Sequence, residues 1–232
     1  MTSALEPMKP SPTRAERALA TRWRMVKAAY EQFCSNGYLG TTISAVAKEA
    51  GVAVPTIYYT FGTKAALLDE ALGAAIVGFD HWREPPAGPI DMAELLPWHT
   101  WWADFEAAPT SADALDIFVD RGVDILQRVA PLVAAMHGAV GDPDAAQVVR
   151  IGEERRVDSY REVIRVLARK PGGLRRRLSA TAATDIVVAL FSAELYQALA
   201  VGRGWSHSRC TAFFHDVLTG QLLDNHDTSS VV

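Results

Sequence analysis

The feature that most constrains this chain is the segment between residues 41 and 62, where glycines separate two short runs with helical spacing. In the first run, apolar side chains recur at the three- and four-residue spacing of one helix face, and Gly51 then ends the run. These side chains are Ile43, Val46, Ala47 and Ala50. Thr41 and Thr42 supply a hydroxyl cap at its start. The pattern predicts a short helix with a sharp stop.

The second run follows after a break of three residues. Pro55 suits the first turn of a helix, where its missing N–H costs nothing, and Gly62 ends the run after Phe61. Two short helices joined by a tight glycine turn form a helix-turn-helix, which sets its second helix in the major groove of DNA. The spacing therefore predicts a recognition helix that begins near Val54.

Longer helices are predicted on both sides of this motif. The upstream helix starts near Arg14 and ends at Asn36-Gly37, with an apolar stripe made by Val26, Ala29, Tyr30 and Phe33. Thr63 caps the downstream helix, which is expected to run to about Trp82.

Charge is distributed unevenly along the chain. The 232 residues carry a net charge of -4, yet eight basic residues and only three acidic ones lie between Lys9 and Lys64. A basic end on an acidic body is what a protein needs if only that end contacts phosphates. For Arg14 to Lys27 taken alone, a solvated helix face is the alternative.

The remaining sequence predicts an all-α fold, because Pro and Gly separate helix-length segments and no alternating stretch suggests a sheet. The expected segments are 90–107, 111–130, 132–140, 144–170, 180–201 and 208–223. The predicted organisation is a disordered lead-in at 1–13, a three-helix DNA-binding domain at 14–62, a helical ligand-binding and dimerisation domain at 63–224, and a disordered tail at 225–232.

The residues of the N-terminal region resemble the TetR family over about Arg22 to Leu72. The similarity rests on more than a dozen residue types in one order and spacing. They are Val26, Ala28-Ala29, Phe33, Gly37-Tyr38, Thr41-Thr42-Ile43, Val46-Ala47, Ala50-Gly51-Val52, Thr56-Ile57-Tyr58-Tyr59, Phe61 and Lys64. The segment Thr184 to Leu223 also resembles the paired final helices of many members. The resemblance implies a ligand-responsive transcriptional regulator.

The positions that match the family's motif give the candidate DNA contacts. Base edges are expected to meet the first turns of the recognition helix, and phosphates its later turns and flanks. The candidates are Thr42, Val54, Pro55, Thr56, Tyr58, Tyr59, Thr60 and Lys64. Ala53 and Val54 depart from the family, which often has Ser and a polar or basic residue there, so base reading depends on apolar contacts and hydroxyls.

The candidate effector site lies in the C-terminal domain, where the resemblance implies a cavity. Trp98, Trp101, Trp102 and Phe105 have helical spacing and form an aromatic stripe. The stripe is either a pocket wall for a small apolar or aromatic effector or a packed core face. Further candidates are Phe118, Met136, His137 and Tyr160.

Broad apolar faces on the last two helices, about 180–223, predict a homodimer built on a four-helix interface. Twofold symmetry then sets the two recognition helices about 34 Å apart and implies a palindromic operator. The resemblance implies that an effector acts by shifting the helix that starts at Thr63.

Other classes of protein find less support. The sequence has no phosphate-binding Gly loop, nucleophile elbow or metal-ligand spacing, so we expect no enzyme, no metal and no cofactor. No charge-free apolar run of eighteen residues and no signal sequence is found, so we expect a cytoplasmic protein without membrane contact.

Three alternatives stay open. The apolar recognition helix is compatible with a protein-interaction module that no longer binds DNA. Cys34 is either an inert core thiol or an oxidant sensor. Repression is favoured as the output, with activation as the other possibility.

Overall fold

The computed structural model describes residues 13–84 and 92–224 and is all-helical over these residues. The predicted tail and nearly all of the predicted lead-in lie outside the described residues. The α-helices are α1 (Arg14–Gly40), α2 (Ile43–Ala50), α3 (Val54–Phe61), α4 (Lys64–Val77), α5 (Met92–Leu95), α6 (Trp102–Ala107), α7 (Ser111–Val129), α8 (Val133–Gly138), α9 (Pro143–Arg169), α10 (Ala180–Leu190), α11 (Ala193–Ala200) and α12 (His207–Leu222). Short 3-10 turns are η1 (Leu96–Trp98), η2 (Ala130–Leu132) and η3 (Ala139–Gly141).

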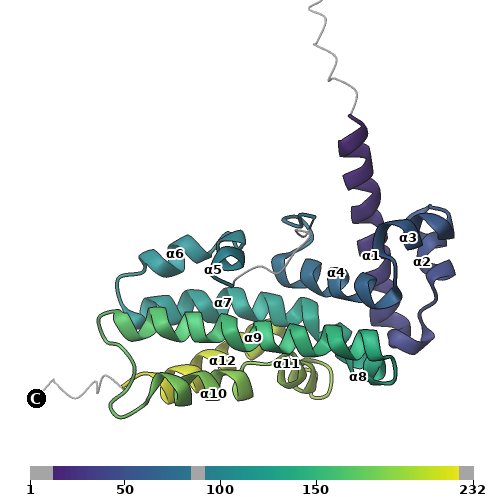
Figure 1. Ribbon diagram of the computed structural model, residues 1–232. Coiled ribbons are helices and arrows are strands. Elements are labelled where there is room, and N and C mark those ends of the chain that lie inside the picture. The colour runs from purple at the N-terminus through teal and green to yellow at the C-terminus, as the bar shows by residue number, and fades with distance from the viewer. Residues whose placement is uncertain (1–12, 85–91, 225–232) are drawn as a thin grey trace, which may run out of the picture.

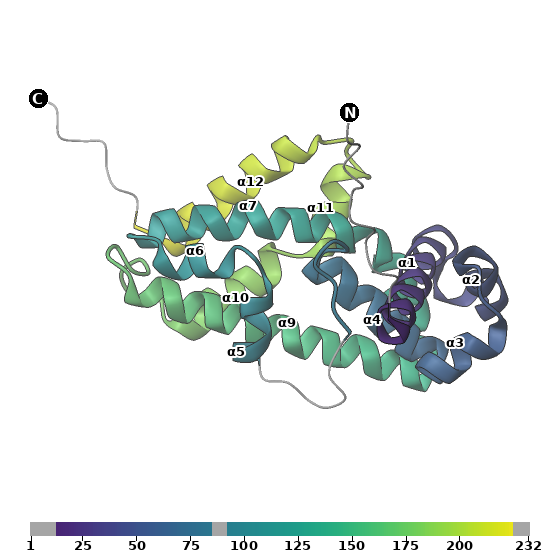
Figure 2. The same ribbon diagram turned by 90° about the horizontal axis from the view of Figure 1, so that it is seen from above.

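Helices α1 to α3 form one end of the molecule, and α7 and α9 to α12 form the body (Figures 1 and 2). Helix α4 lies between these two parts and packs against α1, α7 and α9. The first two turns of α1 are exposed and project beyond its neighbours (Figure 1).

The predicted caps at Thr42 and Thr63 are present, whereas the Thr41 hydroxyl donates to the Gln32 and Gly37 carbonyls of α1 and does not cap α2. The Thr42 side chain accepts a hydrogen bond from the Ala45 N–H at the start of α2, and Gly51 ends that helix with φ of 66°. A residue with a side chain is strained at such an angle, which explains the glycine. Gly37, with φ of 67°, likewise interrupts α1 where the sequence predicted its end.

Two predicted helices are shorter than expected. The helix predicted from Thr63 to about Trp82 ends at Val77, because the chain turns at Gly78 with φ of 100°. The predicted single helix 90–107 is wrong over its described residues, since η1 and an extended His99 separate α5 from α6. Trp98 and Phe105 therefore do not share one helix face, and the predicted stripe is divided.

The helix predicted at 180–201 is also two helices. Phe191 leaves the helical conformation and Ser192 caps α11 by accepting from the Leu195 N–H. The Tyr160 hydroxyl donates to the freed Phe191 carbonyl at 2.7 Å, and the Arg156 guanidinium donates to the Val188 carbonyl at 3.1 Å. These bonds supply partners for carbonyls that the break removes from the helix ladder.

The stretch Ala180–Ala200 is apolar and long enough to cross a membrane by length and composition. It contains Asp185 and Glu194, and the break at Phe191 divides it. Phe191 and Tyr196 from this stretch are buried in the core. Its apolar character is accounted for in part by packing within the protein.

The buried side chains form two clusters. One joins α6, α7, α9, α10, α11 and α12 in the body. The other joins α1 to α4 and extends to Leu132, Ala135, Ala139 and Ala145. The predicted domain boundary at residue 62 stays a prediction, and α4 packs into the same cluster as the helices before it.

Candidate nucleic-acid interface and ligand cavity

Helix α3 presents two tyrosines outward. Tyr59 is 93% exposed and Tyr58 is 52% exposed, whereas Ile57, which directly precedes them, is 1% exposed and anchors the helix in the core. Neither hydroxyl has a hydrogen-bond partner among the described residues. Pro55 is exposed on the first turn of the same helix. The outer face of α3 is therefore free to contact another molecule.

The other candidates on α3 are partly engaged within the protein. Val54 is half-buried against the N-terminal core, and the Thr60 hydroxyl donates to the Thr56 carbonyl at 2.8 Å. Ala53 stands at the N-cap position and supplies no side-chain hydrogen bond. The start of α3 therefore lacks the cap that a Ser would provide.

Lys64 has a structural role in addition to the expected phosphate contact. Its ammonium group donates to the Tyr38 carbonyl at 2.8 Å and to the Thr41 carbonyl at 3.2 Å. It also lies 4.1 Å from the centre of the Tyr38 ring. Two of its three N–H donors thus hold the end of α1 and the linker to α2, and one is left for a phosphate oxygen.

The arginines of α1 differ in their exposure to solvent and in their partners. Arg14, Arg17 and Arg24 are exposed or nearly so on α1. Arg22 instead forms a bidentate pair with Glu70, with Nε and Nη2 at 2.8 and 2.7 Å from its oxygens. This pair joins α1 to α4, and it raises the pKa of Arg22.

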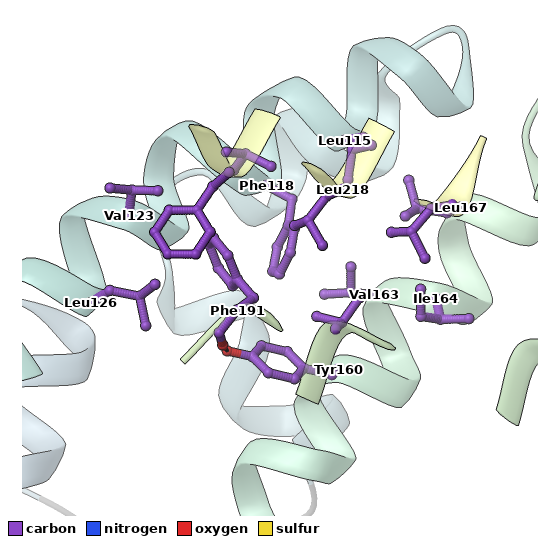
Figure 3. Close-up of a cluster of buried hydrophobic side chains, with 14 of the residues drawn as sticks. Leu115, Phe118, Val123, Leu126, Tyr160, Val163, Ile164, Leu167, Phe191 and Leu218 are labelled. Carbon is purple, nitrogen blue, oxygen red and sulfur yellow. Dashed lines mark hydrogen bonds between the residues drawn. The ribbon is translucent and has the colours of Figure 1, made fainter. Parts of the chain in front are cut away.

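The predicted effector residues divide into a buried cluster and a set of dispersed positions. Trp102, Phe105, Phe118 and Tyr160 are buried side by side with Phe191, and Figure 3 shows how closely three of these rings approach one another. Successive ring centroids in this group lie 5.0 to 6.5 Å apart. The rings fill the interior of the body, which favours the core alternative for these four positions.

The remaining candidates are dispersed. Trp98 lies near Arg83, with 5.9 Å between the guanidinium carbon and the ring centre, and Met136 packs between the two core clusters. His137 is exposed on α8. Trp101 is the one predicted effector residue that lines the cavity described next.

We call this hollow the junction cavity, because it lies where the end of α4 meets α7 and the loop before α6. Its volume is about 310 Å³. Its walls combine aromatic and charged side chains. The lining residues are Val77, Gly78, Phe79, Asp80, His81, His99, Thr100, Trp101, Arg121, Asp124, Ile125 and Arg128.

Arg128 connects the junction cavity to α4. Its Nε donates to the Ala75 carbonyl at 2.7 Å, and its Nη2 donates to the Ile76 carbonyl at 3.3 Å. These carbonyls belong to the last turn of α4, which has no later helical N–H to bind them. The Arg128 carbonyl in turn accepts from the Tyr30 hydroxyl of α1 at 2.7 Å. The cavity wall is thus bonded to both α4 and α1.

Burial lowers the pKa of His99, which also lines the cavity, to about 4, with a further contribution from the Arg128 charge. His99 is therefore neutral at physiological pH.

Burial also raises the pKa of the Cys34 thiol to about 11, which disfavours the reactive thiolate that an oxidant sensor would need.

A second hollow of about 430 Å³ lies between α9 and α10. Three arginines of α9, Arg161, Arg165 and Arg169, line it together with Thr184 and Asp185. Arg161 and Arg165 are already paired with acidic neighbours on their own helix. None of its lining residues belongs to α4 or to the N-terminal helices.

Sequence reasoning missed Arg128, Arg121 and His99. Arg128 and Arg121 lie among alternating charged positions on a helix, where a solvated face is the ordinary interpretation. Their closeness to α4 depends on the packing of segments about fifty residues apart. No local pattern signals it.

The comparisons with known proteins agree with this geometry. Residues 25–71 match the model of the family "Bacterial regulatory proteins, tetR family". No curated protein matches the chain. Many solved structures share the fold.

A protein from Mesorhizobium loti, described as a TetR-family transcriptional regulator, has a TM-score of 0.63 at 18% identity, covering 90% of this chain and 96% of its own. The regulator FadR from Bacillus subtilis in complex with stearoyl-CoA has a TM-score of 0.58 at 14% identity, covering 84% and 96%. A protein from Saccharomonospora viridis, described as a transcriptional regulator and bound to choline, has a TM-score of 0.63 at 18% identity, covering 88% and 97%.

At these identities the structures show a shared fold, and the family match covers the helix-turn-helix itself. The matched family and these neighbours are regulators rather than enzymes. Residues 25–71 of this chain are thus similar to the tetR family of bacterial regulatory proteins, and the chain as a whole shares the fold of solved TetR-family regulators.

Proposed function

We propose that this protein is a homodimeric transcriptional repressor that leaves a palindromic operator when a small molecule binds its C-terminal domain. The observation that carries the proposal is the outer face of α3. Tyr59 is 93% exposed and contributes nothing to the core, in a helix held rigidly by the buried Ile57. A large exposed aromatic residue on a recognition helix is explained by contact with DNA.

The proposed DNA contacts follow from the placement of the candidates. Pro55, Thr56 and Tyr58 contact base edges, with Val54 adding apolar contact. Thr42, Tyr59, Thr60 and Lys64 contact phosphate oxygens. The exposed Arg14 and Arg17 on α1 add positive charge at the same end of the molecule. DNA binding would then weaken steeply as salt increases.

The proposed homodimer pairs the last two helical segments, 180–223, with their twofold copies. Ile186 and Leu190 on α10 and Phe213 and Val217 on α12 are half-buried apolar residues of these segments. Covering them by a second copy removes apolar surface from water.

The junction cavity is the proposed effector site because its wall is bonded to α4 by Arg128. The N-terminal end of α4 packs in the core of the helix-turn-helix, with Leu67 and Leu68 fully buried there. A ligand that moves the C-terminal turn of α4 would therefore reorient the recognition helix. The stearoyl-CoA and choline complexes of the neighbours support small-molecule binding by this fold. Their different chemistry does not identify the effector.

The test is binding of the full-length protein to DNA from upstream of its own gene, across a salt series, with shuffled DNA as competitor. We expect specific binding with a steep salt slope. Tyr59→Ala should weaken binding about tenfold without lowering the melting temperature, because Tyr59 makes no core contact. The matched control is Val140→Ala, which removes an exposed side chain from η3 and should leave affinity unchanged.

A well-folded protein that shows no preference for the upstream DNA over shuffled DNA at low salt would overturn the proposal. That result would favour the protein-interaction module. Because the protein is proposed to act on DNA, we place its action in the cytoplasm of the bacterial cell.

A further inference from the structure

We propose that the junction cavity binds a small organic anion, a carboxylate or phosphate carried on a planar ring, and that Arg121 and Arg128 recognise the anionic group. The consequence for DNA binding rests on the proposed function, whereas the ligand class rests on the cavity alone.

The first argument is the state of the two arginines. Among the described residues, neither guanidinium has a carboxylate within 4.0 Å. Arg128 is half-buried, and its donors reach only neutral carbonyls of α4. A desolvated cation with neutral partners gains strongly from an anion, because charge-assisted hydrogen bonds are about twice as strong as neutral ones.

The acidic residues of the cavity do not cancel this preference. Asp124 is 3.1 Å from the His207 Nε2, and its charge acts on Arg128 without an ion pair within 4.0 Å. Asp80 is exposed, so water and salt screen its charge. Arg121 is exposed at the rim, where it can meet an incoming anion without having to break a bond within the protein.

The second argument is the aromatic part of the lining. Trp101 and Phe79 both line the cavity, and the Trp101 and His99 ring centroids lie 5.4 Å apart. Phe79 is held edge-on by Tyr30, with 4.8 Å between the ring centroids. Aromatic side chains and cationic groups in one cavity fit a planar ring that ends in an anionic group.

The volume limits the size of the ligand. About 310 Å³ lies at the small end of the range for ligand pockets. One or two rings with their substituents fit this space, whereas a long acyl chain does not.

The same arginine gives the ligand a route to α4. The Ala75 and Ile76 carbonyls take two of the five N–H donors of Arg128, which leaves three donors for an anion. An anion bound to these donors would shift the guanidinium that holds the last turn of α4. Ligand recognition and the position of α4 thus depend on one side chain.

The test is isothermal titration of the full-length protein, without DNA, with three probes: benzoate, phenyl phosphate and the neutral, shape-matched benzamide. We expect saturable binding of at least one anion, about tenfold or more tighter than benzamide. The tighter of the two anions identifies the carboxylate or the phosphate as the preferred group.

Variants localise the binding. Arg121→Gln, at an exposed position that should not affect folding, is expected to weaken anion binding about tenfold, and Trp101→Ala to weaken it as well. Arg161→Gln, which removes an exposed arginine from α9, is the matched control and should change nothing. Equal affinity for benzamide and the anions, no saturable binding of either anion, or an unchanged Arg121→Gln would each overturn the inference.

The two proposals fail separately. Anion binding without specific DNA binding would leave the ligand class standing and remove the regulatory consequence. Specific DNA binding by a protein that binds neither anion would leave the repressor standing and overturn the ligand class.

Discussion

Gly122 in α7 is a position where a hydrogen in place of a methyl group lets Phe191, at the break between α10 and α11, pack against the helix. A Cβ at this position would lie 2.5 Å from the Cε1 atom of Phe191 and 2.6 Å from its Cζ atom. Glycine inside a helix costs up to about 1 kcal/mol relative to alanine, so only the close approach of the Phe191 ring explains it.

We therefore expect Gly122→Ala to lower the free energy of unfolding by about 1–3 kcal/mol, because overpacking outweighs the gain in helix propensity. Urea denaturation measures the change. The matched control is Gly73→Ala in α4, where nothing lies within 4 Å of the added Cβ. That variant should be neutral or more stable, and a stabilised Gly122→Ala would contradict the packing argument.

The lowered pKa of His99 predicts how the free energy of unfolding depends on pH. Its pKa is lowered to about 4 in the folded protein by burial and by Arg128, against an ordinary value of about 6.5. Between these values the unfolded chain binds the proton more readily than the folded chain. Stability is thus fully present above about pH 6.5 and is lost as the pH falls toward 4, by at most about 1.4 kcal/mol per pH unit.

The measurement is urea denaturation of the wild type and of His99→Gln at pH 7 and pH 5. Other groups titrate in both proteins, so the difference between them isolates His99. We expect the wild type to lose more stability than the variant between the two pH values. Equal losses would show that His99 is not held neutral by the fold.

At the scale of elements, α4 is positioned by contacts at both of its ends and along its length. Arg128 holds its last turn, Lys64 in its first turn holds the end of α1 and the linker to α2, and Glu70 in its middle binds Arg22 of α1. Glu70 is 7% exposed, so its carboxylate depends on Arg22 for compensation.

Arg22→Ala should therefore lower the free energy of unfolding by about 3 kcal/mol, since it leaves the Glu70 carboxylate buried without its partner. Thermal or urea unfolding checks this value. Glu154→Ala breaks the exposed pair that Glu154 makes with Arg150 on α9 and should cost less than about 1 kcal/mol. If both variants had the same small effect, the α1–α4 pair would not be holding these helices together.

At the scale of the whole molecule, the proposed dimer can be tested with a substitution that leaves the fold of each protomer intact. Val217 on α12 is half-buried and is not among the side chains packed against the body core. Val217→Glu should convert the dimer to a monomer in sedimentation experiments, because a charge would be buried at the twofold interface. Loss of the second half-site should then weaken operator binding about tenfold or more.

The control is Gln127→Glu, which adds the same charge at an exposed position of α7, outside the proposed interface. It should remain a dimer with unchanged DNA affinity. A Val217→Glu protein that stays dimeric would place the interface elsewhere.

The sequence by itself determined the features that depend on neighbours along the chain. The ends of α2 and α3, the Thr42 cap and the turn at Gly51 were predictable, because capping, glycine conformation and apolar spacing act within a few residues. Only the tertiary structure decided the features that depend on distant segments. The break at Phe191 and the bond from Arg128 to α4 need partners about thirty or more residues away. At these places tertiary packing outweighs the helical pattern of the local sequence. A buried carbonyl needs a hydrogen-bond partner, and the fold supplies that partner from a distant segment.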